Sequence, residues 1–359
     1  LGIFSVSASD ENKIWPALNR GLMIAAVLSA IGFYFAAQYL FTDMKLFYAT
    51  LTGLITTIII ANITDYYTSK QKIPVKEIAR ASETGAATNV IAGLALGMKS
   101  TFWPVIVISL AIVTSFYFAG VFGIAMAALG LLSLTGIIMS IDTFGPISDN
   151  AGGIAQMAKM DKKVRKVTDA LDAVGNTTKA TTKGVAIASA ALSALALLVA
   201  FIEATNLTSI DVTRPKVLVG LLIGGMIPFL FSSYLMKAVG NAAHLIVKEV
   251  RRQFKEIKGL MSGRAKPDYA RCVDISTKAA LRELVMPALI AVASPVLVGL
   301  LLGAEALGAL LIGSVVSGLL LALTLANAGA AWDNAKKYIE DGNLGGKGSE
   351  THKAAVVGD

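Results

Sequence analysis

Long apolar runs alternate with short polar stretches along the whole chain. A helix that crosses a bilayer needs roughly 20 mainly apolar residues, because about 30 Å of hydrocarbon is spanned at about 1.5 Å per residue. Eight stretches meet this requirement: 20–41, 46–64, 101–119, 121–144, 184–203, 217–239, 283–302 and 305–331. They lack the alternation of strands, and backbone in lipid must satisfy its hydrogen bonds internally. The sequence therefore predicts an all-α, polytopic transmembrane helix bundle that forms a single domain over residues 1–359.

Composition supports the same class of protein. Of the 359 residues, 55% are hydrophobic and 16% charged, which excludes an ordinary soluble enzyme. The net charge of +8 is not read as nucleic-acid binding, because aromatic residues make up only 7% and the apolar runs are too long. One cysteine (Cys272) and two histidines (His244 and His352) exclude a disulfide framework and leave little for zinc, haem or iron–sulfur sites. Because the chain begins at Leu1 without Met and ends in a polar stretch, we read it as an internal piece of a longer chain.

The basic residues predict the orientation, since short cytoplasmic loops retain Lys and Arg. Threading alternate loops to opposite sides leaves only Lys45, Arg214 and Lys216 outside. The long polar segments then all lie on the cytoplasmic side, and we expect catalytic segments near 145–183, 240–282 and 332–359. The basic run 248–266 also fits a solvated extension of the sixth span.

Small residues at four-residue spacing predict close helix contacts, because lipid gives helices no hydrophobic reason to associate. Such pairs are Gly220 with Gly224, Gly299 with Gly303, and Ser314 with Gly318. No repeat of fixed length is evident.

A polar motif lies at the inner end of the fourth span, over 145–153. Pro146 and the glycines there are expected to loosen the backbone beside Asp149 and Asn150. Carboxylate and amide oxygens suit a hard cation such as Mg²⁺. A helix-ending turn would use the same residues, so both interpretations stay open.

A second motif, 169–183, leads into the fifth span. At about 100° per residue, its polar members fall within an arc of about 80° on one helix face. They are Asp169, Asp172, Asn176, Lys179 and Lys183. This stripe indicates either a binding surface or a solvated amphipathic face.

The eighth span ends in a third motif, 330–338, where Asp333 precedes Lys336 and Lys337 by three and four residues. These side chains can share a helix face and hold a charged ligand, or can simply stabilise the helix and anchor it. Lysines interleaved with carboxylates and amides fit a polyanion carried with divalent metal ions. The sequence contains no P-loop motif.

At these same residues the sequence resembles the membrane-integral, ion-pumping inorganic pyrophosphatases. The motifs that carry the resemblance are 145–154, 169–178, 331–339 and 352–359, and it extends over the entire chain. The family has sixteen spans, so this chain resembles its C-terminal half without the last helix. The water-activating aspartate pair of the family and its ion gate would lie outside this chain.

The resemblance implies a role for individual residues. Asn176, Lys183 and Lys336 would bind pyrophosphate, while Asp149, Asn176, Asp333 and Asp359 would help to hold Mg²⁺. It also implies pyrophosphate as substrate, H⁺ as the transported ion, and a homodimer in a bilayer, with no nucleic-acid partner. The membrane would be the prokaryotic cell (inner) membrane, with the catalytic side in the cytoplasm.

Lys179 and Thr182 make the chain similar to the potassium-independent, proton-pumping branch of that family. A tethered ammonium at Lys179 can supply the positive charge that a bound K⁺ would otherwise supply.

The alternative function is a secondary transporter or channel without hydrolysis. Such a protein should carry ionisable groups near the bilayer midplane. Here only Asp142 lies some way into a span, and the other charges gather at the inner helix ends.

Overall fold

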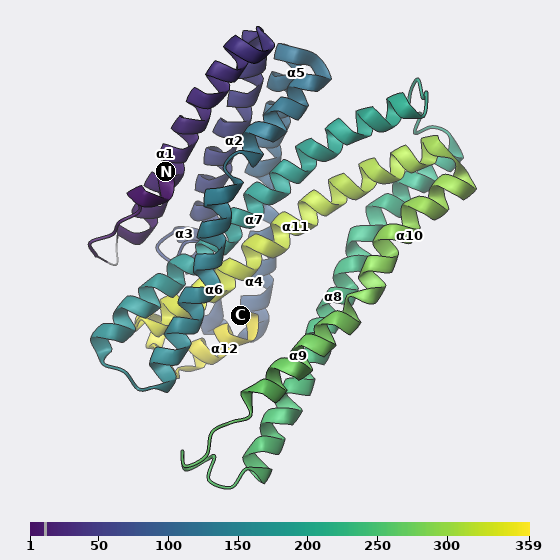
Figure 1. The fold of residues 1–359 in the computed structure, drawn as a ribbon. Helices are drawn as coiled ribbons and strands as arrows, with labels where there is room; N and C mark the ends of the chain where they lie inside the picture. The colour runs from purple at the N-terminus through teal and green to yellow at the C-terminus, as the bar shows by residue number, and fades with distance from the viewer. Residues whose placement is uncertain (11–12) are drawn as a thin grey trace. The chain divides into compact units, whose positions relative to one another are not determined.

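The computed structural model describes residues 1–10 and 13–359, and the regular structure in this part of the chain is entirely helical (Figure 1). The α-helices are α1 (Ile14–Ala36), α2 (Met44–Thr68), α3 (Ile73–Ala81), α4 (Ala86–Lys99), α5 (Phe102–Leu132), α6 (Thr135–Met157), α7 (Lys162–Ala204), α8 (Pro215–Glu256), α9 (Tyr269–Glu283), α10 (Val285–Leu302), α11 (Ala304–Glu340) and α12 (Glu350–Gly358). Short helical turns are η1 (Gly2–Ser5), η3 (Ala37–Phe41), η4 (Ser82–Thr84) and η5 (Asn343–Gly345). The all-α prediction is confirmed.

Seven helical segments of the described chain, rather than eight, are long and apolar enough to cross a membrane. They are Ile14–Phe41, Met44–Thr84, Ala86–Leu132, Lys162–Ala204, Pro215–Glu256, Tyr269–Leu302 and Ala304–Glu340. The difference lies in the expected span 121–144, which is interrupted at Ser133 and Leu134 between α5 and α6. The break predicted at residue 120 is present, because Ala119 and Gly120 leave helical geometry and Gly120 has φ +58°. Glycine adopts this left-handed backbone without a steric penalty.

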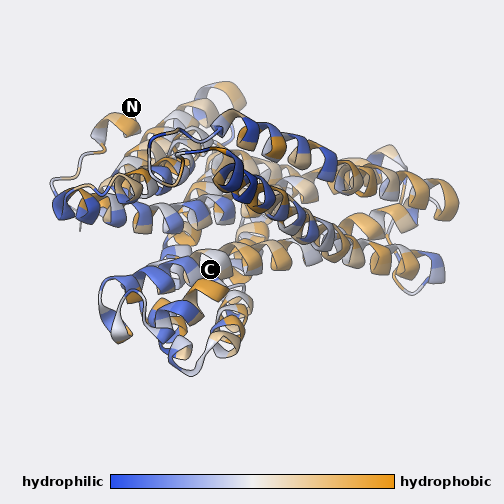
Figure 2. Ribbon diagram, turned by 90° about the horizontal axis from the view of Figure 1, so that it is seen from below, coloured by the Kyte–Doolittle hydropathy of each residue, from blue (hydrophilic) through white to orange (hydrophobic). Residues whose placement is uncertain are grey.

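The chain forms two compact units, Leu1–Val199 with Leu319–Asp359, and Ala200–Gly318. Helices α7 and α11 each have residues in both units. Every residue that the sequence analysis proposes as a ligand lies in the first unit. Figure 2 shows hydrophobic residues along much of the long helices, with hydrophilic residues concentrated at helix ends and in loops.

In the first unit α2 and α5 pack closely. A Cβ atom added to Gly53 would overlap the carbonyl group of Ala127, and one added to Gly130 would overlap that of Thr50. Small residues at both positions therefore allow backbone-to-backbone contact, the main source of helix association in lipid. The adjoining core includes the buried side chains Leu54, Ile60, Leu131, Leu134 and Leu192.

A second core in this unit fixes the end of α11. Val75 and Ile78 of α3 pack with Ala331 and Ile339 of α11 in a fully buried cluster. Figure 1 shows α12 beside α4, and the two helices are in contact. The Ser349 side chain caps α12 by accepting a hydrogen bond from the backbone N–H of His352. This packing determines where Asp359, at the end of α12, is placed.

The motif 145–153 does not end a helix or open into a flexible turn, contrary to one expectation from the sequence. Helix α6 continues through Pro146 to Met157. Its glycine serves a close helix contact instead. A Cβ on Gly145 would lie 2.7 Å from Cγ of Lys179, and one on Gly175 would lie 2.6 Å from Oγ of Ser148.

In the second unit, most of the small residues at four-residue spacing lie at close helix contacts, as predicted. Gly220 and Gly224 of α8 lie against the backbone of α11, and Ser314 Oγ donates a 3.1 Å hydrogen bond to the carbonyl oxygen of Gly224. Gly303 differs, because it has open space around it and ends α10 with φ +97°. The extension of the sixth span is confirmed as far as Glu256, where α8 ends, whereas the rest of the basic run 248–266 lies outside that helix.

Candidate functional site

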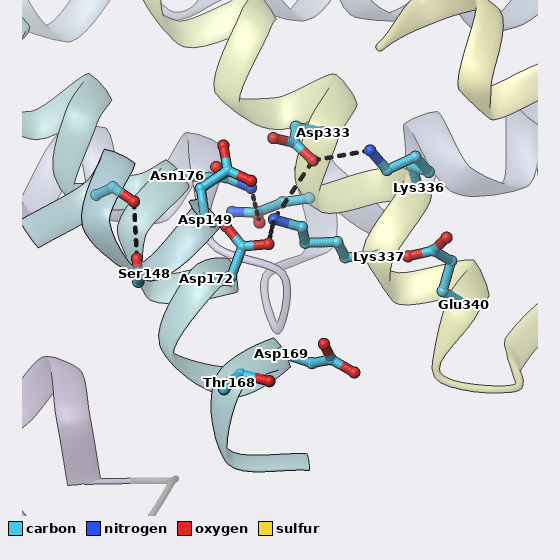
Figure 3. Close-up of polar contacts among 12 residues, drawn as sticks. Ser148, Asp149, Thr168, Asp169, Asp172, Asn176, Asp333, Lys336, Lys337 and Glu340 are labelled. Atoms are coloured by element: carbon cyan, nitrogen blue, oxygen red, sulfur yellow. Dashed lines mark hydrogen bonds and ion pairs between the residues drawn. The ribbon is translucent and has the colours of Figure 1, made fainter. Parts of the chain in front are cut away.

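Two helices bring the second and third polar motifs together. Lys337 of α11 donates from Nζ to Oδ2 of Asp172 on α7 at 2.5 Å, although 165 residues separate them. The same ammonium lies 3.6 Å from Oδ1 of Asp333. Figure 3 shows the side chains of Asp172, Asp333 and Lys337 pointing toward one another. The Lys337 and Asp172 side chains are only 12% and 13% exposed, so this ion pair is largely shielded from water.

Lys336 forms the other half of the cluster. Its Nζ atom lies 2.5 Å from Oδ2 of Asp359 and 3.3 Å from Oδ1 of Asp333. Burial raises the pKa of Asp359 above its ordinary value, and the negative charge of Asp333 acts in the same direction. The three-residue and four-residue spacing predicted for Asp333, Lys336 and Lys337 therefore produces a shared face, and α12 adds a second carboxylate to it.

Asn334 connects the two helices below this cluster. Its amide donates 2.7 Å to the carbonyl oxygen of Thr68 and 3.1 Å to Oγ1 of Thr177. Its Oδ1 atom accepts a 3.2 Å hydrogen bond from the amide of Asn176. Both asparagines are buried, so these bonds fix the orientation of the Asn176 side chain.

Lys179 of α7 contacts two polar side chains of the first and second motifs. Its Nζ atom is 3.3 Å from Oδ2 of Asp149 on α6 and 3.5 Å from Oδ1 of Asn176. Asp149 is the more exposed member, with a side chain 57% accessible. One ammonium thus bridges two of the side chains that the sequence analysis assigns to the metal.

Thr182 and Lys183 differ in their surroundings. Thr182 is buried, and its hydroxyl donates a 2.6 Å hydrogen bond to Oδ1 of Asp142. Lys183 is exposed and forms no ion pair or hydrogen bond within residues 1–10 and 13–359. The structure therefore brings Lys336, Asp333, Asp359, Asn176 and Asp149 into bonded groups but leaves Lys183 outside them.

The carboxylate oxygens of the cluster are of the chemical type that binds a hard cation such as Mg²⁺. Asp172 Oδ1 is buried and accepts no hydrogen bond from the described chain. Asp333 Oδ1 is also buried without a hydrogen bond there, and it contacts the ammonium groups of Lys336 and Lys337 only as an ion pair. Such carboxylate oxygens are typical ligands of Mg²⁺, which also keeps several waters and takes oxygens from phosphate groups. No group of three or more His, Cys, Asp and Glu side chains in the described part of the chain is close enough to hold a metal ion alone. A metal ion here would thus need ligands from a substrate, from water or from other protein segments.

Two interactions within the site were not identified from the sequence. Asn334 stands between Asp333 and Lys336, and only the fold shows that its amide faces α7. Lys337 and Asp172 were recognised as polar, but nothing in their spacing indicated that they pair across two helices. An asparagine within a charged motif at the end of an apolar helix is the one signal that could have directed attention to Asn334.

These features define a class of protein: an integral membrane protein of long helices that gathers lysine, aspartate and asparagine side chains where α6, α7, α11 and α12 meet. A family model described as "Inorganic H+ pyrophosphatase" matches residues 1–359. The chain belongs to this family.

Individual relatives support the assignment. A K(+)-insensitive pyrophosphate-energized proton pump of Methanosarcina mazei is 52% identical over 369 residues, covering 100% of this chain and 55% of that protein. A protein of the same name from Caldanaerobacter subterraneus subsp. tengcongensis is 49% identical, with 100% and 55% covered. A putative K(+)-stimulated pyrophosphate-energized sodium pump of Clostridium tetani is 50% identical, with 100% and 54% covered. The chain thus spans about half the length of the curated relatives it matches, and overall identity does not separate the two kinds of pump.

Proposed function

We propose that this chain forms part of a membrane-bound inorganic pyrophosphatase that hydrolyses pyrophosphate to phosphate and couples the reaction to H⁺ translocation. Family membership gives the reaction class, and the convergence of Lys336, Lys337, Asp333, Asp172 and Asp359 is the observation that carries the proposal. A cluster with several lysines and several carboxylates can bind an anion and a cation together, as a metal pyrophosphate complex requires.

The ion pairs of the cluster indicate how it would bind substrate. Without a ligand, Lys336 and Lys337 neutralise Asp359 and Asp172. Arrival of phosphate oxygens and a cation allows the pairs to exchange partners, so that each lysine faces phosphate and each carboxylate faces the cation. The buried charges then remain compensated throughout, which avoids the large penalty of an unpaired buried charge.

In this proposal Asn176, Lys183 and Lys336 contact pyrophosphate, and Asp149, Asn176, Asp333 and Asp359 provide the metal side. The metal is Mg²⁺, which would neutralise charge on the phosphate oxygens when bound. Lys183 occupies the same face of α7 as Asn176, two turns further along the helix at 3.6 residues per turn. Because the Lys183 side chain is exposed, its ammonium is accessible to an anionic ligand.

Potassium independence rests on Lys179 and Thr182. The ammonium of Lys179 lies 3.3 Å from Asp149 and 3.5 Å from Asn176, among oxygen atoms of the kind that bind an alkali cation. A tethered charge of this kind makes a bound K⁺ unnecessary. The relative named as a K(+)-stimulated pump is about as similar as the K(+)-insensitive ones, so this local feature carries more weight than identity.

The orientation and assembly follow the same reasoning. The basic residues favour a cytoplasmic catalytic side, and the family resemblance favours a prokaryotic cell membrane and a homodimer. The single transmembrane domain over 1–359, and a catalytic contribution from 240–282, remain predictions.

Sealed vesicles that contain the complete protein test the proposal. Pyrophosphate hydrolysis and internal acidification are followed together, with and without Mg²⁺. Phosphate release and acidification that both require Mg²⁺ support the proposal. Proton movement without hydrolysis would favour the secondary transporter, and hydrolysis without acidification would remove the coupling.

A further inference from the structure

A second polar cavity lies in the first unit, with a volume of about 940 Å³. It is lined by the start of α1 at Trp15, by the end of α2 and the turn that follows, by the first turns of α7, and by the end of α11 at Tyr338. A volume of this size is sufficient for a small ligand. None of the side chains Asp172, Asn176, Lys179, Asp333, Lys336 and Lys337 lines it.

Helix α7 contributes residues to both the cavity and the ion-pair cluster. At about 100° per residue, Lys162, Lys166, Asp169, Ala173 and Thr177 fall within one arc of about 80°, and all five line the cavity. Asp172, Asn176 and Lys179 fall on the neighbouring arc and do not line the cavity. Arg165 lies on that arc too, but nearer the start of α7, where it lines the cavity. Asp169 therefore belongs to the cavity and not to the cluster, although the sequence placed it on one stripe with them.

The lining carries an excess of positive charge. Its basic side chains are Lys70, Lys72, Lys76, Lys162, Arg165 and Lys166. Its acidic side chains are Asp65, Asp169, Glu340 and Asp341, which leaves an excess of two positive charges.

One of the four acidic groups is neutralised from outside the cavity, which increases this excess. Glu340 lies 3.2 Å from Lys347 and 3.0 Å from His352, and neither partner lines the cavity. Within the lining, Lys70 pairs with Asp341 at 2.7 Å, so one base and one acid balance each other there. A cleft with low-dielectric walls and an excess of positive charge attracts an anionic ligand.

Arg165 provides a separate indication of a ligand. Its terminal nitrogen Nη2 binds both carboxylate oxygens of Asp169 at 3.2 Å. Its Nε atom is buried and has no hydrogen-bond partner in the part of the chain that the structure describes. Buried donors in proteins are nearly always satisfied, so this one calls for an acceptor. The guanidinium fork suits the oxygens of a phosphate group.

We propose that this cavity binds a phosphate group, carried either by a free phosphate anion or by a phospholipid head group. Arg165 Nε donates to a phosphate oxygen, while Lys162 of α7 and Lys72, between α2 and α3, supply further positive charge. Basic pockets between membrane helices bind lipid head groups by the same chemistry. The site does not depend on pyrophosphate hydrolysis, and its test uses binding rather than activity.

The first probe is inorganic phosphate, measured by equilibrium dialysis with the complete protein in detergent. Saturating Mg²⁺ and a non-hydrolysable diphosphonate are present throughout, so that the proposed catalytic site is occupied. The second probe is phosphatidylglycerol, measured as lipid retained in native mass spectrometry after reconstitution. Retention of phosphate alone identifies a free anion as the source, and retention of the lipid alone identifies a head group.

The test variant is Arg165→Gln/Lys162→Gln, and the matched control is Lys163→Gln, an exposed neighbour that does not line the cavity. We expect at least tenfold weaker binding in the test variant and unchanged binding in the control. If the test variant unfolds at a lower temperature than the wild type, Lys72→Gln/Lys76→Gln replaces it. Equal binding by wild type and cavity variants, or no binding of either probe to the wild type, overturns the proposal.

Discussion

Lys179 of α7 lies 3.3 Å from Asp149 of α6, measured from Nζ to Oδ2, and the contact is possible because Gly145 faces Lys179 without a side chain. A Cβ at Gly145 would approach Cγ and Cε of Lys179 to 2.7 and 2.8 Å. The glycine that was expected to loosen α6 therefore makes room for the ammonium. The position of the Lys179 ammonium and the packing of α6 against α7 therefore both depend on the glycine at position 145.

The pair Lys337 and Asp172 should behave as a buried ion pair. Lys337→Gln leaves the Asp172 carboxylate without its partner, and Asp172→Asn leaves Lys337 with only the longer contact to Asp333. Each variant should therefore lower the free energy of unfolding by about 3 kcal/mol. The double variant Asp172→Asn/Lys337→Gln should recover part of this loss. The apparent unfolding midpoint in detergent measures the effect.

An exposed pair provides the control for that experiment. Lys353 and Glu350 lie 2.6 Å apart, but their side chains are 65% and 89% exposed. Lys353→Gln should leave the midpoint nearly unchanged. If the buried and exposed variants shifted the midpoint equally, the buried pair would have no special role.

Asn334 should act through the orientation of Asn176. Asn334→Ala removes the acceptor of the Asn176 amide and the donor to Thr68 and Thr177. Loss of a positioning hydrogen bond should lower kcat/KM for pyrophosphate about tenfold, which corresponds to about 1.4 kcal/mol. Asn62→Ala, at an exposed position of α2 where the amide donates to the carbonyl oxygen of Ile58, should leave kcat/KM unchanged. Equal activity of both variants would contradict the positioning role.

The contact between α2 and α5 should not tolerate a methyl group. Gly53→Ala would place Cβ against the carbonyl of Ala127, so we expect a loss of about 1–3 kcal/mol of stability from overpacking. Gly32→Ala in α1 has open space around it and should be neutral or slightly stabilising. The yield of folded protein and its unfolding midpoint distinguish the two, and a neutral Gly53→Ala would mean that the helices are not in close contact.

Much of this architecture could be predicted from hydropathy, because a bilayer sets the length of each apolar helix. The break at Gly120 and the close approach of Gly220 and Gly224 also followed from the sequence. The continuation of α6 through Pro146 did not, since a proline and several glycines are typical of both a turn and a tight helix contact. The contact of α7 with α6 at Gly145 shows that the motif forms a tight helix contact and not a turn.

The candidate site was predictable in its residue types but not in its pairing. Helix periodicity placed Asp333, Lys336 and Lys337 on one face correctly. It could not separate Asp169 from Asp172, because the boundary between cavity and cluster is set by the helices that pack on each side. Contacts such as Asn334 with Asn176 join residues 158 positions apart, and no local pattern encodes them.

Thr182 should support Lys179 without replacing it. Its hydroxyl donates to Asp142 at 2.6 Å, so Thr182→Val removes a hydrogen bond but no charge. We expect hydrolysis in K⁺-free buffer to fall severalfold, since one hydrogen bond is worth about 1 kcal/mol. Thr143→Val, at an exposed position of α6, is the control. A complete loss of K⁺-free activity in Thr182→Val would mean that Thr182, rather than Lys179, determines potassium independence.

The central claim is that the ammonium of Lys179 stands in for a potassium ion. Pyrophosphate hydrolysis is measured in vesicles with the complete protein, wild type and Lys179→Ala, as K⁺ is raised from zero in buffer containing Mg²⁺. The wild type should be fully active without K⁺, whereas Lys179→Ala should be nearly inactive without K⁺ and regain activity as K⁺ increases. Wild-type hydrolysis that requires K⁺, or a Lys179→Ala variant that stays fully active without it, would contradict the claim.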